Sequence, residues 1–209
     1  DRESGGMKIS SFPLAGIVDE ALALLAERID AKALRVMRSV EDPALTVRAD
    51  RDKILQVFLN LVGNAVKFSR ERGAIEVSAR RGKPGFALVQ VKDTGVGIAK
   101  EDLEKVFDRF YQAGDGAAQR KEGTGIGLAI VRNILQLHGC VVHATSEPGE
   151  GTVVSFTLPL AKERSQAQAV PTPTPAPDPP GTPPPPAAPS APARTGEVER
   201  PRLRIIRRG

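Results

Sequence analysis

The sequence has one cysteine, no tryptophan and one tyrosine among its 209 residues. Because Cys140 has no cysteine partner, the chain can form neither an intrachain disulfide nor a cysteine-based zinc site, as is usual in a reducing cytoplasm. No apolar run approaches the ~20 residues that cross a bilayer, and no signal peptide is visible. We therefore expect a cytoplasmic location, although a longer protein could carry a membrane anchor upstream of Asp1.

Proline is scarce in the first 160 residues and dense after them. Of the 18 prolines, 13 lie between Pro171 and Pro201. Proline lacks a backbone donor and fixes φ, so this segment cannot build a core and is predicted to be an extended, disordered tail over 161–209. A single folded domain is expected over 13–160, after a junction over 1–12.

The positive charge is concentrated in that tail. Of the net charge of +5, residues 161–209 carry +4, which leaves about +1 for the rest of the chain. A domain that binds nucleic acid concentrates basic side chains on its folded face. We therefore expect no nucleic-acid binding by the folded domain. For the basic end of the tail two interpretations stay open, the start of a further domain after a linker and an electrostatic contact with acidic surfaces.

Apolar periodicity and turn residues predict helices that alternate with antiparallel hairpins. The expected helices cover 13–31, 51–69, about 100–106 and 126–138. The expected strands cover 34–40, 45–48, 74–80, 86–93, about 140–146 and 152–158. Asp50 is expected to cap the helix over 51–69. This order predicts an α/β (α+β) two-layer sandwich, in which a mixed, mostly antiparallel sheet packs on three helices.

A polar line runs along the predicted helix 51–69. At 100° per residue, Asn60, Asn64 and Lys67 lie within about 60° of one another on an otherwise apolar helix. Carboxamide oxygens suit a hard cation such as Mg²⁺, and a lysine suits a phosphate. The alternative is a solvated face of an amphipathic helix, and this motif alone does not decide between them.

Two glycine motifs follow. In the first, Asp93 ends a strand and precedes Gly95 and Gly97; a carboxylate there can accept an amine hydrogen bond while the glycines allow close approach. Alone, this pattern is more typical of an ordinary Asp-initiated turn. The second, GTGIGL at 123–128, opens a helix as phosphate-binding loops do, but its spacing matches neither the Rossmann fingerprint nor the P-loop. A glycine-rich hinge is the alternative.

The order of these motifs is more informative than any one of them. With FDRFYQ at 107–112 between the second and the third, they resemble the N, G1, F and G2 boxes of the catalytic, ATP-binding domain of sensor histidine kinases, a member of the Bergerat-fold ATPase group. The N box is NLVGNAVKFS, the G1 box DTGVGI and the G2 box GTGIGLAIV. SEPGEGTVVSFTLPL resembles the final hairpin of the family, and the resemblance covers residues 7–160.

The resemblance assigns roles to individual residues. Asn64 would coordinate Mg²⁺ with support from Asn60, Lys67 would contact phosphate, and Asp93 would accept a hydrogen bond from the adenine amine. Asn60, Asn64 and Lys67 would be the catalytic residues, and 108–124 a flexible lid. The full set implied to bind ATP is Asn60, Asn64, Lys67, Phe68, Asp93, Gly95, Gly97, Ile98, Arg109, Gln112, Gly123, Thr124, Gly125, Gly127 and Leu128.

The implied function is that of a two-component sensor histidine kinase, which transfers the γ-phosphoryl group of ATP to a histidine on a dimerisation segment. The implied partners are that segment, in a homodimer, and a response regulator. The only histidines are His138, at a predicted helix end, and His143, on a predicted strand. Neither has the helical, acidic setting of the acceptor in the family, so we expect the acceptor upstream or on another chain.

Three alternatives stay open. A Bergerat-fold ATPase would carry a glutamate base where Asn60 stands, and an amide cannot take that proton. A serine-directed kinase of the anti-sigma type fits the set Asn60, Asn64 and Lys67 less well. A non-catalytic nucleotide-binding scaffold is disfavoured by the intact motifs.

Overall fold

The structure is a computed structural model that describes residues 6–113 and 124–161. The tail expected over 161–209, apart from Ala161, lies outside the described residues, as do Gly123 and most of the expected lid. The strands are β1 (Ile9–Pro13), β2 (Arg35–Val40), β3 (Thr46–Asp50), β4 (Ala74–Arg81), β5 (Phe86–Asp93), β6 (Val142–Glu147) and β7 (Gly151–Pro159). The helices are α1 (Leu14–Leu24), α2 (Ala26–Ala31), α3 (Arg51–Phe68) and α4 (Gly127–Leu137), with 3₁₀ turns η1 (Lys100–Asp102) and η2 (Lys105–Phe107).

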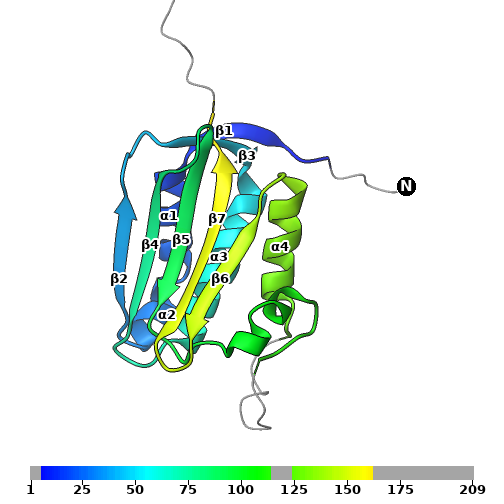
Figure 1. Ribbon diagram of the computed structural model, residues 1–209. Coiled ribbons are helices and arrows are strands. Elements are labelled where there is room, and N and C mark those ends of the chain that lie inside the picture. Colours follow the sequence, from blue (N-terminus) through cyan, green and yellow to red (C-terminus); the bar gives the residue numbers. More distant parts are fainter. Residues whose placement is uncertain (1–5, 114–123, 162–209) are drawn as a thin grey trace, which may run out of the picture. The chain divides into compact units, whose positions relative to one another are not determined.

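Five strands form the main sheet in the order β2-β4-β5-β7-β6, and α1, α3 and α4 cover one of its faces (Figure 1). Only the pair β2–β4 is parallel; β4–β5, β5–β7 and β6–β7 are antiparallel. β1 and β3 form a separate two-stranded sheet. The predicted mixed sheet with helices on one face is confirmed.

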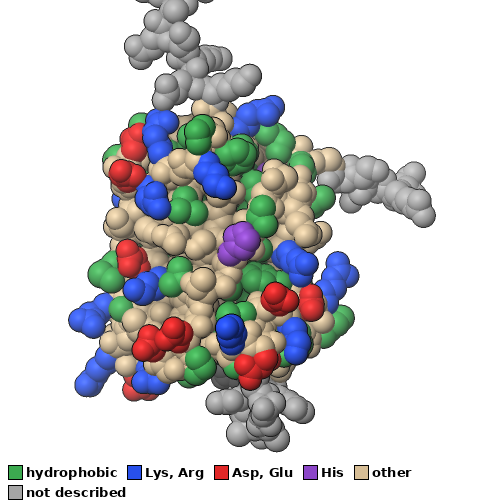
Figure 2. Space-filling model, in the orientation of Figure 1, with side chains coloured by type: hydrophobic (Ala, Val, Ile, Leu, Met, Phe, Trp, Pro, Cys, Tyr) green, Lys and Arg blue, Asp and Glu red, His purple; other side chains and the backbone are tan. Residues whose placement is uncertain are grey.

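The uncovered face of the sheet carries mixed polar side chains. Figure 2 shows basic and acidic groups interspersed over it, without one extended hydrophobic area. Alternate residues of the strands point to this face or to the helices; in β7, Val154, Phe156 and Leu158 are buried. The hydrophobic core therefore lies between the sheet and the helices.

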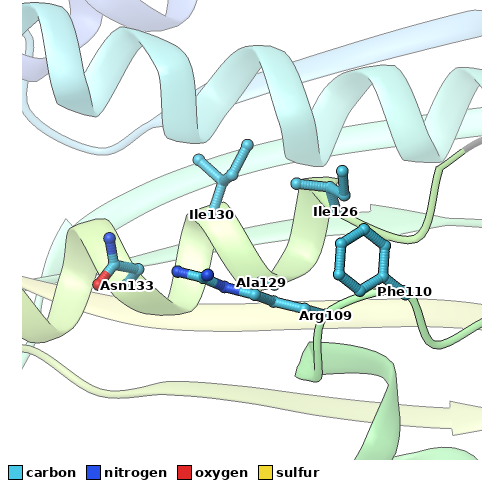
Figure 3. A pocket seen from close by; sticks show the side chains of 6 residues that line it. All are labelled: Arg109, Phe110, Ile126, Ala129, Ile130 and Asn133. Atoms are coloured by element: carbon cyan, nitrogen blue, oxygen red, sulfur yellow. The ribbon is translucent and has the colours of Figure 1, made fainter.

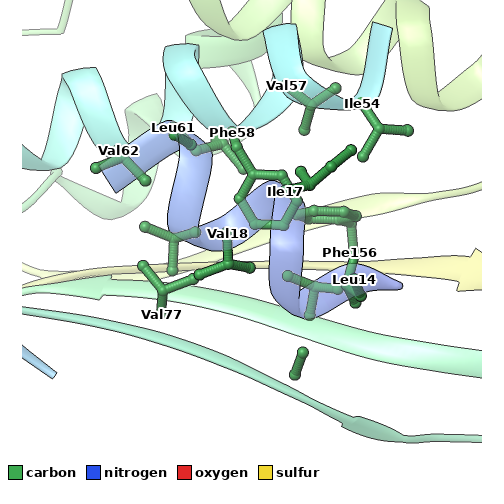
Figure 4. Close-up of a cluster of buried hydrophobic side chains, with 14 of the residues drawn as sticks. Leu14, Ile17, Val18, Ile54, Val57, Phe58, Leu61, Val62, Val77 and Phe156 are labelled. Carbon is green, nitrogen blue, oxygen red and sulfur yellow. The ribbon is translucent and has the colours of Figure 1, made fainter. Parts of the chain in front are cut away.

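The core fixes α3 against the sheet. Phe58 of α3 and Phe156 of β7 are both buried, with ring centroids 5.8 Å apart and ring planes at 67°, an edge-to-face contact (Figure 4). Val57, Leu61 and Val62 continue this buried side of the helix. Because packing fixes the apolar side of α3 against the sheet, it also fixes the orientation of the polar side, which carries Asn60 and Asn64.

The start of α3 is capped as expected. Asp50 accepts a hydrogen bond from the backbone N–H of Lys53 at 3.2 Å and another from that of Lys8 at 2.9 Å. Burial favours the protonated carboxyl, but these N–H donors and the positive charge of Lys53 outweigh it, so the pKa of Asp50 lies below its ordinary value. The ionised cap thus holds the β1 and α3 segments together.

Three local features differ from the sequence predictions. The helix expected over 13–31 is divided at Leu25, so that Leu25 and Ile29 both stay in the core. The segment over 100–106 forms two 3₁₀ turns instead of one helix. Strand β1 begins in the segment 1–12, which we expected to be a junction, and ends at Pro13, which we expected to begin a helix; it pairs with β3 from Ile9↔Asp50 to Pro13↔Thr46.

Candidate functional site

The polar line on α3 faces the beginning of α4. Asn60 and Asn64 are partly buried, and Asn60 donates from Nδ2 to the carbonyl of Gln56 at 2.9 Å. A Cβ added at Gly127 would lie 3.2 Å from Asn60 Oδ1 and 3.9 Å from Asn64 Nδ2. The structure therefore brings together two predicted site residues on α3 and the glycine that opens α4.

The first turn of α4 has no side-chain cap. Ile126 stands at the N-cap position and makes no capping hydrogen bond, so the side chain at this position leaves the first N–H groups of the helix available. Such a helix start favours anions because its N–H groups and its dipole both point to them. Thr124, Gly125 and Leu128 lie around this start, and Leu128 also packs against the core.

Asp93 lies at the end of β5, opposite Ile75 of β4 and Thr152 of β7. Its carboxylate accepts hydrogen bonds from the backbone N–H groups of Gly95, at 2.8 Å, and Thr152. Burial raises the pKa of Asp93 above its ordinary value, while the two N–H donors oppose that rise. A partly desolvated carboxylate with remaining acceptor capacity is suited to bind an amine donor.

The loop after Asp93 is attached to the end of α3. Val96 N–H donates to the carbonyl of Phe68 at 3.3 Å, and Ser69 and Gly95 form an isolated β-bridge. A Cβ at Gly95 would lie 2.5 Å from the Phe68 carbonyl oxygen, so only glycine fits there. Phe68 is 46% exposed, and Lys67 Nζ lies 4.6 Å from the centroid of its ring.

Ser146 on β6 holds the same loop from the other side, a role that the sequence did not suggest. Its Oγ accepts from Ile98 N–H at 2.8 Å, donates to the Gly151 carbonyl at 2.6 Å and lies 3.0 Å from Thr152 Oγ1. Gly97 has φ 72°, and a Cβ there would overlap the backbone of Glu147. The β6–β7 turn therefore determines the shape of the loop that follows Asp93.

The 107–112 segment contacts the glycine-rich loop and α4. Phe110 N–H donates to the Gly125 carbonyl at 2.9 Å, and Arg132 on α4 pairs with Asp108 at 3.2 Å. Arg109 extends along α4 past Ala129 towards Asn133 and lines a cavity of about 170 Å³ (Figure 3). The phosphate contacts expected for Arg109 and for Gln112, which is exposed, stay predictions.

The two histidines lie in unlike settings. His138 Nε2 accepts from the backbone N–H of Asp50 at 3.0 Å, and its Nδ1 lies 2.8 Å from the Ile134 carbonyl. Nε2 therefore joins the end of α4 to the start of α3, and Nδ1 contacts the last turn of α4 itself. His143 is exposed on β6 opposite Ser155, on the uncovered face of the sheet, as the sequence predicted.

Within residues 6–113 and 124–161, no helix has both the length and the apolar character that a membrane span requires. The same residues contain no group of three or more His, Cys, Asp and Glu side chains arranged to hold a metal ion.

Residues 49–162 match the family described as the histidine kinase-, DNA gyrase B- and HSP90-like ATPases. The chain belongs to this ATPase family. Sensor histidine kinase WalK of Bacillus subtilis is 43% identical over 129 residues, which are 61% of this chain and 21% of WalK. The catalytic domain of histidine kinase ThkA has a TM-score of 0.65 and 30% identity, covering 73% of this chain and 96% of that domain.

Other solved structures support the same assignment. Full-length ShkA in complex with AMPPNP has a TM-score of 0.65 and 29% identity, over 74% of this chain and 32% of ShkA. ThkA in complex with the response regulator protein TrrA has a TM-score of 0.61 and 27% identity, over 75% of this chain and 43% of that chain. The described residues form an ATP-binding domain of the histidine kinase type, as the motif order predicted. The chain spans about a fifth of the length of the first curated relatives.

Proposed function

We propose that residues 13–160, together with β1, bind Mg·ATP and deliver its γ-phosphoryl group to a histidine. The observation that carries the proposal is the approach of Asn60 and Asn64 to the uncapped start of α4. Side-chain oxygens that can ligate a cation then lie on α3, and N–H groups that can bind phosphates lie on the facing helix α4. A histidine kinase requires both, because phosphoryl transfer is catalysed mainly by positioning and charge neutralisation.

The adenine is proposed to lie against Asp93, Gly95, Gly97 and Ile98. The carboxylate of Asp93 keeps acceptor capacity beyond the two backbone N–H groups that it binds, and the exocyclic amine of adenine is a matching donor. Phe68 presents a partly exposed ring beside this loop. A base without an amine at that position would leave the carboxylate unpaired, which gives adenine selectivity.

The carboxamide side chains on α3 suit Mg²⁺. Asn60 and Asn64 offer carboxamide oxygens, and the Nδ2 of Asn60 is already engaged with the Gln56 carbonyl, which leaves Oδ1 as its ligand atom. When bound, Mg²⁺ would supply positive charge that neutralises the phosphates. We propose Asn64 as the principal protein ligand, Asn60 as its support and Lys67 as a phosphate contact.

The γ-phosphoryl group needs an acceptor other than water. Asn60 stands where a glutamate base would activate water in a hydrolase of this fold, and an amide cannot accept that proton. His138 uses both ring nitrogens inside the domain, and His143 lies on the face of the sheet opposite α3. We therefore propose that the acceptor histidine lies on a dimerisation segment outside these 209 residues, within a homodimer.

The phosphohistidine would then pass its phosphoryl group to a response regulator. ThkA, a relative in fold and sequence, has been solved with the response regulator protein TrrA, which supports a partner of that kind. Glycine-loop residues Gly123, Thr124, Gly125 and Gly127, with Leu128 behind them, are proposed to receive the phosphates. Arg109 and Gln112 are proposed to approach the phosphates only with nucleotide bound.

Calorimetry of the chain with ATP tests the binding half of this proposal. Binding with Mg²⁺ present, strongly weakened by a chelator and by Asn64→Ala, is the expected result. Asn133→Ala is the matched control, because Asn133 is exposed on α4 outside the proposed set. Equal affinity with and without Mg²⁺, or equal losses in the two variants, would contradict the assignment of Asn64.

A further inference from the structure

The end of α3 lacks the usual glycine cap. The helix ends at Phe68, and the C-cap residue Ser69 has an extended backbone, with φ −65° and ψ 145°. A helix that leaves in this way has no left-handed residue to turn N–H groups back onto its last carbonyls. Those carbonyls need other partners, because unpaired backbone groups away from water are costly.

Every carbonyl from Ala65 to Ser69 has a partner, and three of the five share one. Lys32 Nζ donates to the carbonyls of Val66 at 2.9 Å, Lys67 at 2.6 Å and Ser69 at 3.1 Å. The other two carbonyls accept from backbone groups, that of Ala65 from Ser69 N–H at 3.0 Å and that of Phe68 from Val96 N–H at 3.3 Å. A single ammonium group therefore holds most of the helix end.

Lys32 is itself held in place. It ends α2 as the C-cap residue, it is partly buried, and its carbonyl accepts from Arg72 N–H at 2.9 Å. An ammonium has three donors, which matches three carbonyls, and its charge is favoured at the negative end of the helix dipole. The contact spans 34 to 37 residues of sequence, so it joins α2 to the end of α3.

We propose that Lys32 is a positioning residue of the nucleotide site. This rests on the proposed function, since the peptide units that it binds carry Lys67 and flank Phe68. The same helix end pairs with Gly95 and Val96, so Lys32 also acts on the loop after Asp93. Loss of the ammonium leaves three carbonyls without their donor, and the last turn of α3 then opens more often.

The experiment compares Lys32→Met, Lys32→Arg and the control Lys83→Met in the whole chain. Methionine keeps the length of the side chain and removes every donor; arginine keeps charge and donors; Lys83 is exposed in the β4–β5 turn. For each folded variant, calorimetry gives the dissociation constant of Mg·ATP, and hydrogen exchange reports the amides of Ser69 and Val96. Lys32→Gln, with donors but no charge, replaces the methionine variant if that does not fold.

A dissociation constant about tenfold higher in Lys32→Met is expected, with faster exchange at Ser69 and Val96. Lys32→Arg should restore most of the affinity and Lys83→Met should match wild type. Unchanged affinity in a folded Lys32→Met, with unfolding at lower denaturant, would reduce Lys32 to a purely structural residue and overturn the proposal. Absence of ATP binding by wild type would instead contradict the proposed function, while the exchange rates would still test the anchoring.

Discussion

Gly95 N–H donates a 2.8 Å hydrogen bond to the carboxylate of Asp93, two residues earlier in the chain. The bond turns the chain at the end of β5 and leaves no room for a Cβ at Gly95, which would lie 2.7 Å from Asp93 Oδ1. Asp93 thus shapes the loop that follows it and also carries the acceptor proposed for the adenine amine.

Asp93→Asn is expected to reduce the preference for ATP over GTP more than Asn64→Ala does. An amide can turn its NH₂ group towards the base and so lose discrimination, whereas Asn64 acts through the metal and affects both nucleotides alike. Calorimetric titration of each variant with both nucleotides gives the ratios. If the ATP/GTP ratio of Asp93→Asn equals that of wild type, the adenine assignment is wrong.

ATP affinity is expected to fall as the pH is lowered. Because burial raises the pKa of Asp93, its carboxylate takes up a proton at a higher pH than an ordinary aspartate does. A protonated carboxyl accepts more weakly from the adenine amine, so affinity falls as the pH drops through that pKa. Titrations across this range should show the fall in wild type and a flatter profile in Asp93→Asn; parallel profiles would exclude Asp93 as the cause.

Ser146→Ala should loosen the loop after Asp93. The change removes the acceptor of Ile98 N–H and the donor to the Gly151 carbonyl, so we expect a loss of about 1–2 kcal/mol in unfolding free energy. A severalfold weaker ATP affinity should accompany it. Ser155→Ala is the control, because Ser155 bonds to Gln90 on the uncovered face of the sheet. Denaturant unfolding gives the stability of each variant and calorimetry its ATP affinity. Equal effects of the two substitutions would contradict the assignment of Ser146 to the loop after Asp93.

Asp50→Ala is expected to cost about 1 kcal/mol of stability by removing the cap of α3. The pKa of Asp50 is lowered in the folded state, so its contribution is present above the ordinary value of 3.8 and disappears as the pH falls through the lower, folded pKa. The unfolding curves of wild type and variant should therefore differ at neutral pH and converge at strongly acidic pH. ATP affinity should be unchanged, because Asp50 lies more than two helical turns from Asn60. A large loss of ATP affinity would contradict this expectation and would show that the cap of α3 is coupled to the nucleotide site.

Local patterns predicted most of the fold, and the roles of the individual site residues stay predictions. The apolar spacing of α3, the Asp50 cap and the order of the four boxes depend on residues close in sequence, and so they were predictable. The contacts of Lys32 with Val66, Ser146 with Ile98 and His138 with Asp50 join residues 34 to 88 positions apart. No single-sequence periodicity encodes such pairs, and β1 was missed because its short, mixed segment resembles a loop.

We propose that this domain binds ATP for transfer to a histidine outside the 209 residues, and not for hydrolysis. General-base help contributes ~10²–10⁴-fold, so an amide at position 60 in place of a glutamate base should keep hydrolysis near background. The most direct measurement is incubation with γ-labelled ATP, with and without a histidine-bearing dimerisation segment fused upstream of Asp1. We expect no label on the chain alone, and acid-labile, base-stable label on the added segment that Asn64→Ala abolishes. Acid-labile label on the chain alone, lost in His138→Ala or His143→Ala, would contradict the account.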